Sequence, residues 1–180
     1  MADNELTHDT RRQKTGPSYR VGIITASDKG SRGEREDTSG PLIREIAAAA
    51  GYTVESYLIL PDEQALLEAE MKRICDSGLA DLILTTGGTG FSPRDRTPEA
   101  TLAVAERLAP GIAEAMRMQS MAITKRAMLS RGVAAIRGST LIVNLPGSPR
   151  AVRENLAFII GELQHGLDIL TGRDGECAAS

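Results

Sequence analysis

The stretch LTTGGTGFSPRDRTPEAT, residues 84–101, places a glycine turn and several charged side chains directly after an apolar run. Gly87, Gly88 and Gly90 permit backbone conformations that other residues avoid, or let a ligand approach the main chain closely. The string lacks the Gly-Lys-Ser/Thr end of a P-loop and the last glycine of a dinucleotide-binding fingerprint. It therefore predicts either a plain turn of the chain or a phosphate site of another kind.

A carboxylate beside a bound phosphate needs a cation between them. Two like unit charges about 4 Å apart repel by roughly 4 kcal/mol at an effective dielectric constant near 20. Arg94 and Arg96 flank Asp95, but Mg²⁺ fits this position better because it prefers carboxylate and phosphate oxygens. The alternative for Asp95 is an Asx-turn ahead of Thr97. Asp62, in LPDEQ, is likewise either a ligand of this kind or a helix N-cap.

A second polar stretch, TASDKGSRGEREDTSGP at 25–41, follows another apolar run. It contains Ser27, Asp28 and Asp37 among several charged side chains. A loop this charged is commonly only solvated. Its place at the carboxyl end of a strand nevertheless makes it a candidate wall of a ligand site.

The elements that must position these residues alternate along the chain. Apolar, β-branched runs predict buried strands at 19–26, 52–60, 80–86 and 139–145. Amphipathic segments predict helices at about 40–50, 62–77, 98–108, 110–124 and 149–170. This order predicts an α/β fold, a three-layer αβα sandwich with a mostly parallel central sheet. A hairpin turning at Arg137-Gly138 could add an antiparallel edge strand.

Three helix starts follow predicted strands. Thr97 before Pro98, Ser148 before Pro149, and Asp62 are each expected as N-caps. Ligands of open parallel sheets collect where strands end and helices begin. The three junctions could converge on one crevice.

Composition limits the remaining possibilities. The chain of 180 residues is 41% hydrophobic, which suits one compact domain, expected at 19–171, with a disordered leader at 1–18 and a short tail at 172–180. We find no membrane span and no signal sequence, and expect a cytoplasmic protein. A net charge of −3, with no Trp, two Phe and three Tyr, argues against nucleic-acid binding. Cys75 and Cys177 lack the spacing of a zinc or redox motif.

Taken together, four segments resemble the MogA/MoaB-type molybdopterin-binding family. They are SDKGSRGEREDTSGP, LPDEQ, DLILTTGGTGFSPRDRTPEAT and MLSRGVAAIRGSTLIVNLPGSPRAVRENL. The resemblance covers roughly residues 19–171 and is strongest to the molybdopterin adenylyltransferases, including the G domains of gephyrin-type enzymes. It implies the molybdopterin-binding fold. Arg96 is a departure, because family members usually carry an apolar residue there.

The resemblance also implies a reaction. The terminal phosphate of molybdopterin would attack the α-phosphorus of ATP with Mg²⁺ present, giving adenylylated molybdopterin and pyrophosphate. A phosphate nucleophile is already anionic near neutral pH, so positioning and charge neutralisation would carry catalysis. The alternatives are a non-catalytic module that binds molybdopterin or handles the cofactor, and a hydrolase of nucleotide-like pyrophosphates.

Carried over position by position, the resemblance assigns roles to individual residues. Asp62 and Asp95 match the family's functional aspartates, as catalytic residues and Mg²⁺ ligands. The other implied binding residues are Ser27, Asp28, Gly87, Gly88, Thr89, Gly90, Ser130, Arg131 and Ser148. Ser148 could equally be only a helix cap.

The resemblance further implies a homotrimer and a separate molybdate-insertion protein as partner. The methionine-rich segment 115–129 could supply contact surface between subunits, although methionines at helical spacing more often belong to the core.

Overall fold

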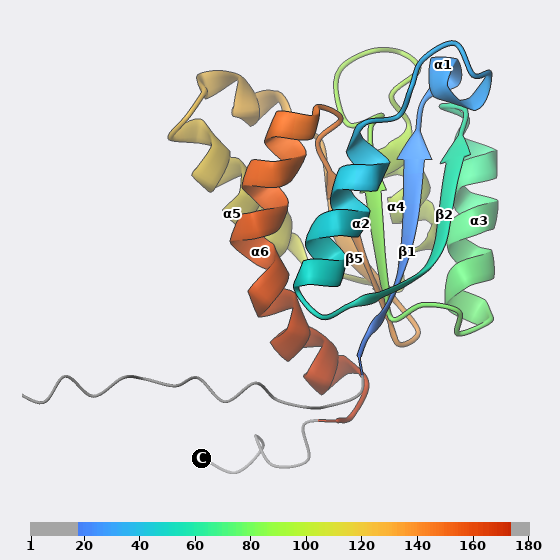
Figure 1. Ribbon diagram of the computed structural model, residues 1–180, viewed down its shortest axis with the longest axis vertical. Helices are drawn as coiled ribbons and strands as arrows, with labels where there is room; N and C mark the ends of the chain where they lie inside the picture. Colours follow the sequence, from blue (N-terminus) through green and yellow to red (C-terminus); the bar gives the residue numbers. More distant parts are fainter. Residues whose placement is uncertain (1–17, 174–180) are drawn as a thin grey trace, which may run out of the picture.

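The computed structural model describes residues 18–173. All but Ser18 of the leader expected at 1–18, and residues 174–180 of the tail expected at 172–180, lie outside the described residues. A six-stranded sheet with the order β2-β1-β3-β6-β5-β4 forms the centre (Figure 1). Its strands are β1 (Arg20–Ala26), β2 (Thr53–Leu60), β3 (Leu82–Thr86), β4 (Arg107–Leu108), β5 (Ala134–Arg137) and β6 (Thr140–Leu145).

The first four strands of the sheet order are parallel, and β5 and β4 add an antiparallel edge. The hairpin predicted at Arg137-Gly138 is confirmed, and Gly138 takes the positive φ, 55°, that the turn requires. The predicted three-layer α/β fold is therefore confirmed, antiparallel edge included.

Helices cover both faces of the sheet. They are α1 (Asp28–Ser31), α2 (Ser39–Ala49), α3 (Gln64–Asp76), α4 (Thr97–Val104), α5 (Pro110–Met121), η1 (Lys125–Leu129) and α6 (Pro149–Leu170). One core cluster joins α2, α5 and α6 to residues such as Ile23 and Val143. The other joins α3 and α4 to Ile24 and Ile142. Adjacent strand residues thus face opposite layers, which explains the continuous apolar runs in the sequence.

Three local predictions were wrong. The helix predicted at 98–108 ends at Val104, because Arg107 and Leu108 pair with β5 instead. Thr97 is the first helical residue rather than the cap, and its hydroxyl donates to the Gly87 carbonyl at 2.9 Å. Asp62 does not cap α3, whose N-cap is Glu63. The cap predicted at Ser148 is confirmed by its hydrogen bond from the Ala151 amide.

Candidate active site

The loops after the parallel strands meet at the carboxyl ends of these strands, where α1 also lies (Figure 1). They enclose a cavity of about 510 Å³, the acidic cavity. Six of the predicted site residues line it, namely Ser27, Asp62, Gly87, Gly88, Asp95 and Ser148. The predicted convergence of strand–helix junctions therefore holds.

Gly87 and Gly88 form the floor between the strands and α4. Their φ angles are 88° and 63°, in the region that favours glycine. A Cβ on Gly87 would stand 2.3 Å from the Ala26 carbonyl oxygen. Thr97 binds both carbonyl oxygens, through its hydroxyl to Gly87 and through its amide to Gly88. The turn is thus fixed by contacts with β1 and α4, and its electronegative oxygens point into the protein.

Asp62 is held by Asp28 on the neighbouring loop. The Asp28 amide donates to Asp62 Oδ2 at 2.9 Å, and the Asp62 amide donates to Asp28 Oδ1 at 3.0 Å. Arg94 donates to both Asp28 oxygens, at 2.9 and 2.8 Å. The loops after β1, β2 and β3 are therefore linked through one carboxylate.

The pKa values of the two linked aspartates are shifted in opposite directions. The hydrogen bond from Arg94 lowers the pKa of Asp28 to about 2. Burial, and then the negative charges of Asp28 and Asp95, raise the pKa of Asp62 in spite of the bond from the Asp28 amide. A carboxylate destabilised in this way gains from a nearby cation.

Asp62 and Asp95 fit a hard cation such as Mg²⁺. Besides burial, repulsion from the Asp95 carboxylate contributes to the raised pKa of Asp62. Gly88 leaves room beside Asp62, because a Cβ there would lie 3.1 Å from Asp62 Oδ1. Within residues 18–173, no group of three acidic, histidine or cysteine side chains is arranged to hold a metal. Other oxygens, from phosphate or water, would have to complete the coordination.

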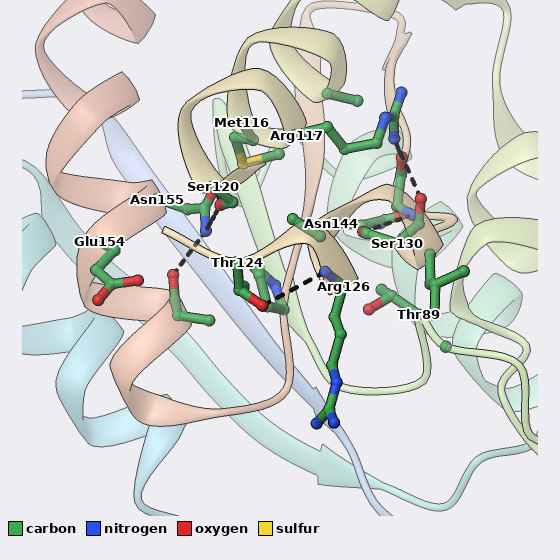
Figure 2. Close-up of a pocket in the computed structure, with 17 residues that line it drawn as sticks. Thr89, Met116, Arg117, Ser120, Thr124, Arg126, Ser130, Asn144, Glu154 and Asn155 are labelled. Atoms are coloured by element: carbon green, nitrogen blue, oxygen red, sulfur yellow. Dashed lines mark hydrogen bonds between the residues drawn. The ribbon is translucent and has the colours of Figure 1, made fainter. Parts of the chain in front are cut away.

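The remaining predicted residues lie apart from the acidic cavity. Thr89, Gly90 and Ser130 line a second cavity of about 320 Å³, the helical cavity, which α5, η1 and α6 enclose (Figure 2). Asp28 and Arg131 line neither of these two cavities. Arg131 pairs with Glu99 and donates to the carbonyl oxygens of Gly90 and Asp95, each at 2.7 Å. It secures the loop that carries Asp95.

The helical cavity contains polar residues that the sequence reading missed. Ser120 on α5 and Asn155 on α6 face each other and are joined by hydrogen bonds of 3.0 and 3.1 Å (Figure 2). Arg117 donates to the Gly132 carbonyl at 2.8 Å. The signal for Asn155 was present, because it interrupts the apolar face formed by Val152, Leu156 and Ile159.

The acidic cavity also has lining residues that were not singled out, among them Thr25, Arg35 and Ser39. The Thr25 hydroxyl is buried and has no hydrogen-bond partner of normal geometry among the described residues. Asp37, in the predicted ligand wall, accepts from the Ser39 and Gly40 amides and from the Tyr57 hydroxyl. Burial opposes its ionisation, but these bonds prevail and lower the pKa of Asp37.

Comparison with known proteins identifies this arrangement. Residues 22–165 match the family model described as "Probable molybdopterin binding domain". The chain belongs to the molybdopterin-binding domain family. The predicted family resemblance is thereby confirmed over most of the chain.

Relatives of this molybdopterin-binding domain include two bacterial proteins named molybdopterin adenylyltransferase. The Helicobacter pylori J99 protein is 40% identical over 156 residues, covering 84% of this chain and 88% of the relative. The Escherichia coli K12 protein is 44% identical over 142 residues, covering 77% of this chain and 72% of the relative.

Solved structures agree with the sequence relatives. The molybdopterin biosynthesis enzyme MoaB of Thermus thermophilus is 50% identical, with a TM-score of 0.81, over 86% of this chain and 97% of that one. The molybdopterin biosynthesis Mog protein of Mycobacterium ulcerans is 35% identical, with a TM-score of 0.80, over 87% and 99%. The described residues of the present chain contain no helix long and apolar enough to cross a membrane.

Proposed function

We propose that the protein is a Mg²⁺-dependent molybdopterin adenylyltransferase, which transfers AMP from ATP to the terminal phosphate of molybdopterin and releases pyrophosphate. One observation carries the assignment of substrates. The glycine turn separates two cavities, with Gly87 and Gly88 lining the acidic cavity and Thr89 and Gly90 lining the helical cavity. A phosphate bound at this turn can be reached from both sides.

The helical cavity suits the pterin end of molybdopterin. Its walls include Ala113, Met116 and Leu129, and a few polar groups such as Ser120 and Asn155 stand among them. Ligand sites for flat heterocycles combine apolar walls with a small number of oriented hydrogen-bonding groups. Of the implied binding residues Ser130 and Arg131, Ser130 lies in this wall and Arg131 does not line the cavity.

The acidic cavity suits ATP with its metal. Asp62 and Asp95 would hold the ion, with phosphate oxygens and water as further ligands. The bound ion would neutralise phosphate charge during transfer. Ser27 and Ser148 add hydroxyl groups to the walls of this cavity.

The chain's own residues orient the reaction rather than exchange protons. An oxygen of the molybdopterin phosphate forms a bond to the α-phosphorus of ATP, and the bond from that phosphorus to the pyrophosphate oxygen breaks. The attacking phosphate is anionic near neutral pH and needs no base. Thr97 keeps the Gly87 and Gly88 carbonyl oxygens away from both phosphates, and Arg131 fixes the loop bearing Asp95.

The homotrimer, the separate molybdate-insertion partner and the cytoplasmic location remain predictions of the sequence. Three methionines of the predicted contact segment, Met118, Met121 and Met128, are exposed and support an interface there. Met116 is buried in the core instead.

The proposal is tested by incubating the protein with molybdopterin, Mg²⁺ and ATP and following the products by mass spectrometry. We expect adenylylated molybdopterin together with pyrophosphate. A non-catalytic module would bind molybdopterin without ATP and release no pyrophosphate. A hydrolase would consume ATP in the absence of molybdopterin.

A further inference from the structure

Three arginines near the glycine turn and the Asp28 loop are already engaged by carboxylates of the protein. Nη2 of Arg94 lies 3.7 Å from Oε1 of Glu63, in addition to its pair with Asp28. Besides its pair with Glu99, Arg131 donates hydrogen bonds to two backbone carbonyls. The pairs are Arg94–Asp28, Arg131–Glu99 and Arg32–Glu34. None of these guanidinium groups lines the acidic cavity.

Arg35 differs from all of them. It lines the acidic cavity from the loop between α1 and α2, and it is exposed. It forms no ion pair and no side-chain hydrogen bond with any residue from 18 to 173. In this part of the chain it is also the only basic residue in the cavity wall. An unpaired guanidinium at a cavity wall is available to a ligand.

The cavity has two walls, set by the two faces of the sheet. Asp62 and Asp95 precede α3 and α4, which pack on one face. The loop with Arg35 leads into α2, which packs beside α6 on the other face (Figure 1). The Ser39 hydroxyl donates to the Gly147 carbonyl at 3.0 Å and ties these two helix starts together. The cavity therefore runs from an acidic wall to a wall that carries Arg35.

The two walls would contact a bound polyanion through different positive charges. At the acidic wall, a divalent cation can bridge carboxylates and phosphate. At the opposite wall, Asp37 is occupied by the Ser39 and Gly40 amides and by Tyr57. Glu36 is a second carboxylate there, and Arg35 is the only positively charged group on that side among the described residues. Guanidinium groups bind phosphate through paired, charge-assisted hydrogen bonds.

We propose that Arg35 binds the β- and γ-phosphates of the nucleotide and holds the pyrophosphate as it leaves, so that this cavity selects nucleoside triphosphates over monophosphates. The inference rests on the proposed function. When the bond between the α-phosphorus and the bridging oxygen breaks, its electron pair passes to pyrophosphate. Arg35 stabilises the negative charge that develops on this leaving group.

The test is calorimetric titration in Mg²⁺ without molybdopterin, using ATP, AMP and pyrophosphate as separate ligands. We expect Arg35→Gln to weaken ATP and pyrophosphate binding about tenfold, the size of a lost charged hydrogen bond, and to leave AMP binding unchanged. Arg35→Lys should recover part of the loss. Arg32→Gln is the matched control, because Arg32 lies on the same loop but pairs with Glu34, and it should bind all three ligands like the wild type.

Two results would overturn the role of Arg35. One is unchanged ATP and pyrophosphate affinity in Arg35→Gln, and the other is an equal loss for AMP, which would place Arg35 on the nucleoside. Failure of the proposed function looks different. A wild-type protein that binds ATP but makes no adenylylated molybdopterin refutes the reaction and leaves the Arg35 result standing, whereas a wild type that binds no ATP refutes both.

Discussion

Asp28 and Asp62 each accept a hydrogen bond from the other's backbone amide, at 3.0 and 2.9 Å, and of the two carboxylates only that of Asp28 accepts hydrogen bonds from Arg94. The pair is therefore unequal. Arg94 stabilises the Asp28 carboxylate, whereas Asp62 has a raised pKa and no basic partner of its own among the described residues. We interpret Asp28 as the residue that positions the loop and Asp62 as the residue whose carboxylate binds the cation.

This inequality predicts that Asp62→Asn stabilises the free protein and abolishes adenylyl transfer. The folded-state pKa of Asp62 lies above its ordinary value, so the carboxylate destabilises the fold once the pH exceeds that pKa. The melting temperature of the variant should exceed that of the wild type near pH 7. The difference should shrink as the pH falls through the folded-state pKa of Asp62, because the folded state then binds the proton before the unfolded state does. It should vanish below the ordinary carboxyl pKa, where both states are protonated.

Melting curves from pH 3 to pH 8, recorded with transfer assays, check this prediction. Glu63→Gln is a suitable control for turnover, since Glu63 is an exposed neighbouring carboxylate that precedes α3, lies 3.7 Å from Arg94 and has no assigned part in the reaction. Normal turnover by Asp62→Asn would remove the metal assignment. A lower melting temperature at neutral pH would show that Asp62 is instead a structural acceptor.

Arg131 is expected to act through the loop it holds. Arg131→Met removes the bonds to the Gly90 and Asp95 carbonyls and leaves Glu99 unpaired. We expect adenylyl transfer to fall about tenfold to a hundredfold, with a loss of roughly 1–2 kcal/mol in unfolding free energy. Arg137→Met, which breaks the Arg137–Asp76 pair on another part of the fold, should cost stability without a comparable loss of rate. Equal rate losses in the two variants would refute a specific role for Arg131.

The glycine turn can be probed with two glycines of nearly equal φ. Gly88 and Gly78 have φ of 63° and 62°, but a Cβ meets Thr97 Oγ1 at 2.4 Å only at Gly88, and meets nothing within 4 Å at Gly78. Gly78→Ala should cost about 1 kcal/mol for its backbone conformation alone. Gly88→Ala should cost more than about 2 kcal/mol and lose transfer activity. Denaturant titration of both variants measures the difference, and equal costs would contradict the close packing at Gly88.

A larger side chain in the helical cavity should weaken the binding of molybdopterin without weakening the binding of ATP. Ala127 lines that cavity, whereas Ala122 is the exposed residue that directly follows α5. Ala127→Leu is expected to raise the KM for molybdopterin about tenfold or more and to leave ATP binding unchanged. Ala122→Leu should leave both unchanged. If Ala127→Leu weakened ATP binding instead, the assignment of the two cavities would be reversed.

The strands could be predicted from the sequence more accurately than the first residues of the helices, for a physical reason. Apolar runs such as residues 80–86 report burial on both faces of a sheet, so β3 was predictable. Capping depends on which partner a side chain finds in the folded protein. Thr97 bonds Gly87, and Asp62 bonds Asp28, which are contacts between segments far apart in the chain. Likewise the two-residue strand β4 exists only through its pairing with β5.

Motif matching placed Asp62 and Asp95 at one cavity with Ser27 and Ser148, as expected. It could not divide the glycine turn between two cavities, since Gly88 and Thr89 are adjacent in sequence and face different spaces. Nor could it distinguish Arg35 from Arg32 on the same loop, because only the fold shows that Arg32 is paired and that Arg35 has no partner within residues 18–173.

The proposed function requires Asp62 and Asp95 to share a divalent cation with the phosphates of ATP. A crystal structure with Mn²⁺ in place of Mg²⁺ and a non-hydrolysable ATP analogue tests it directly, because Mn²⁺ can be located by its anomalous scattering. We predict one peak at coordination distance, roughly 2.1 Å, from a carboxylate oxygen of each aspartate and from an α-phosphate oxygen. A metal and nucleotide bound away from both aspartates would contradict the account.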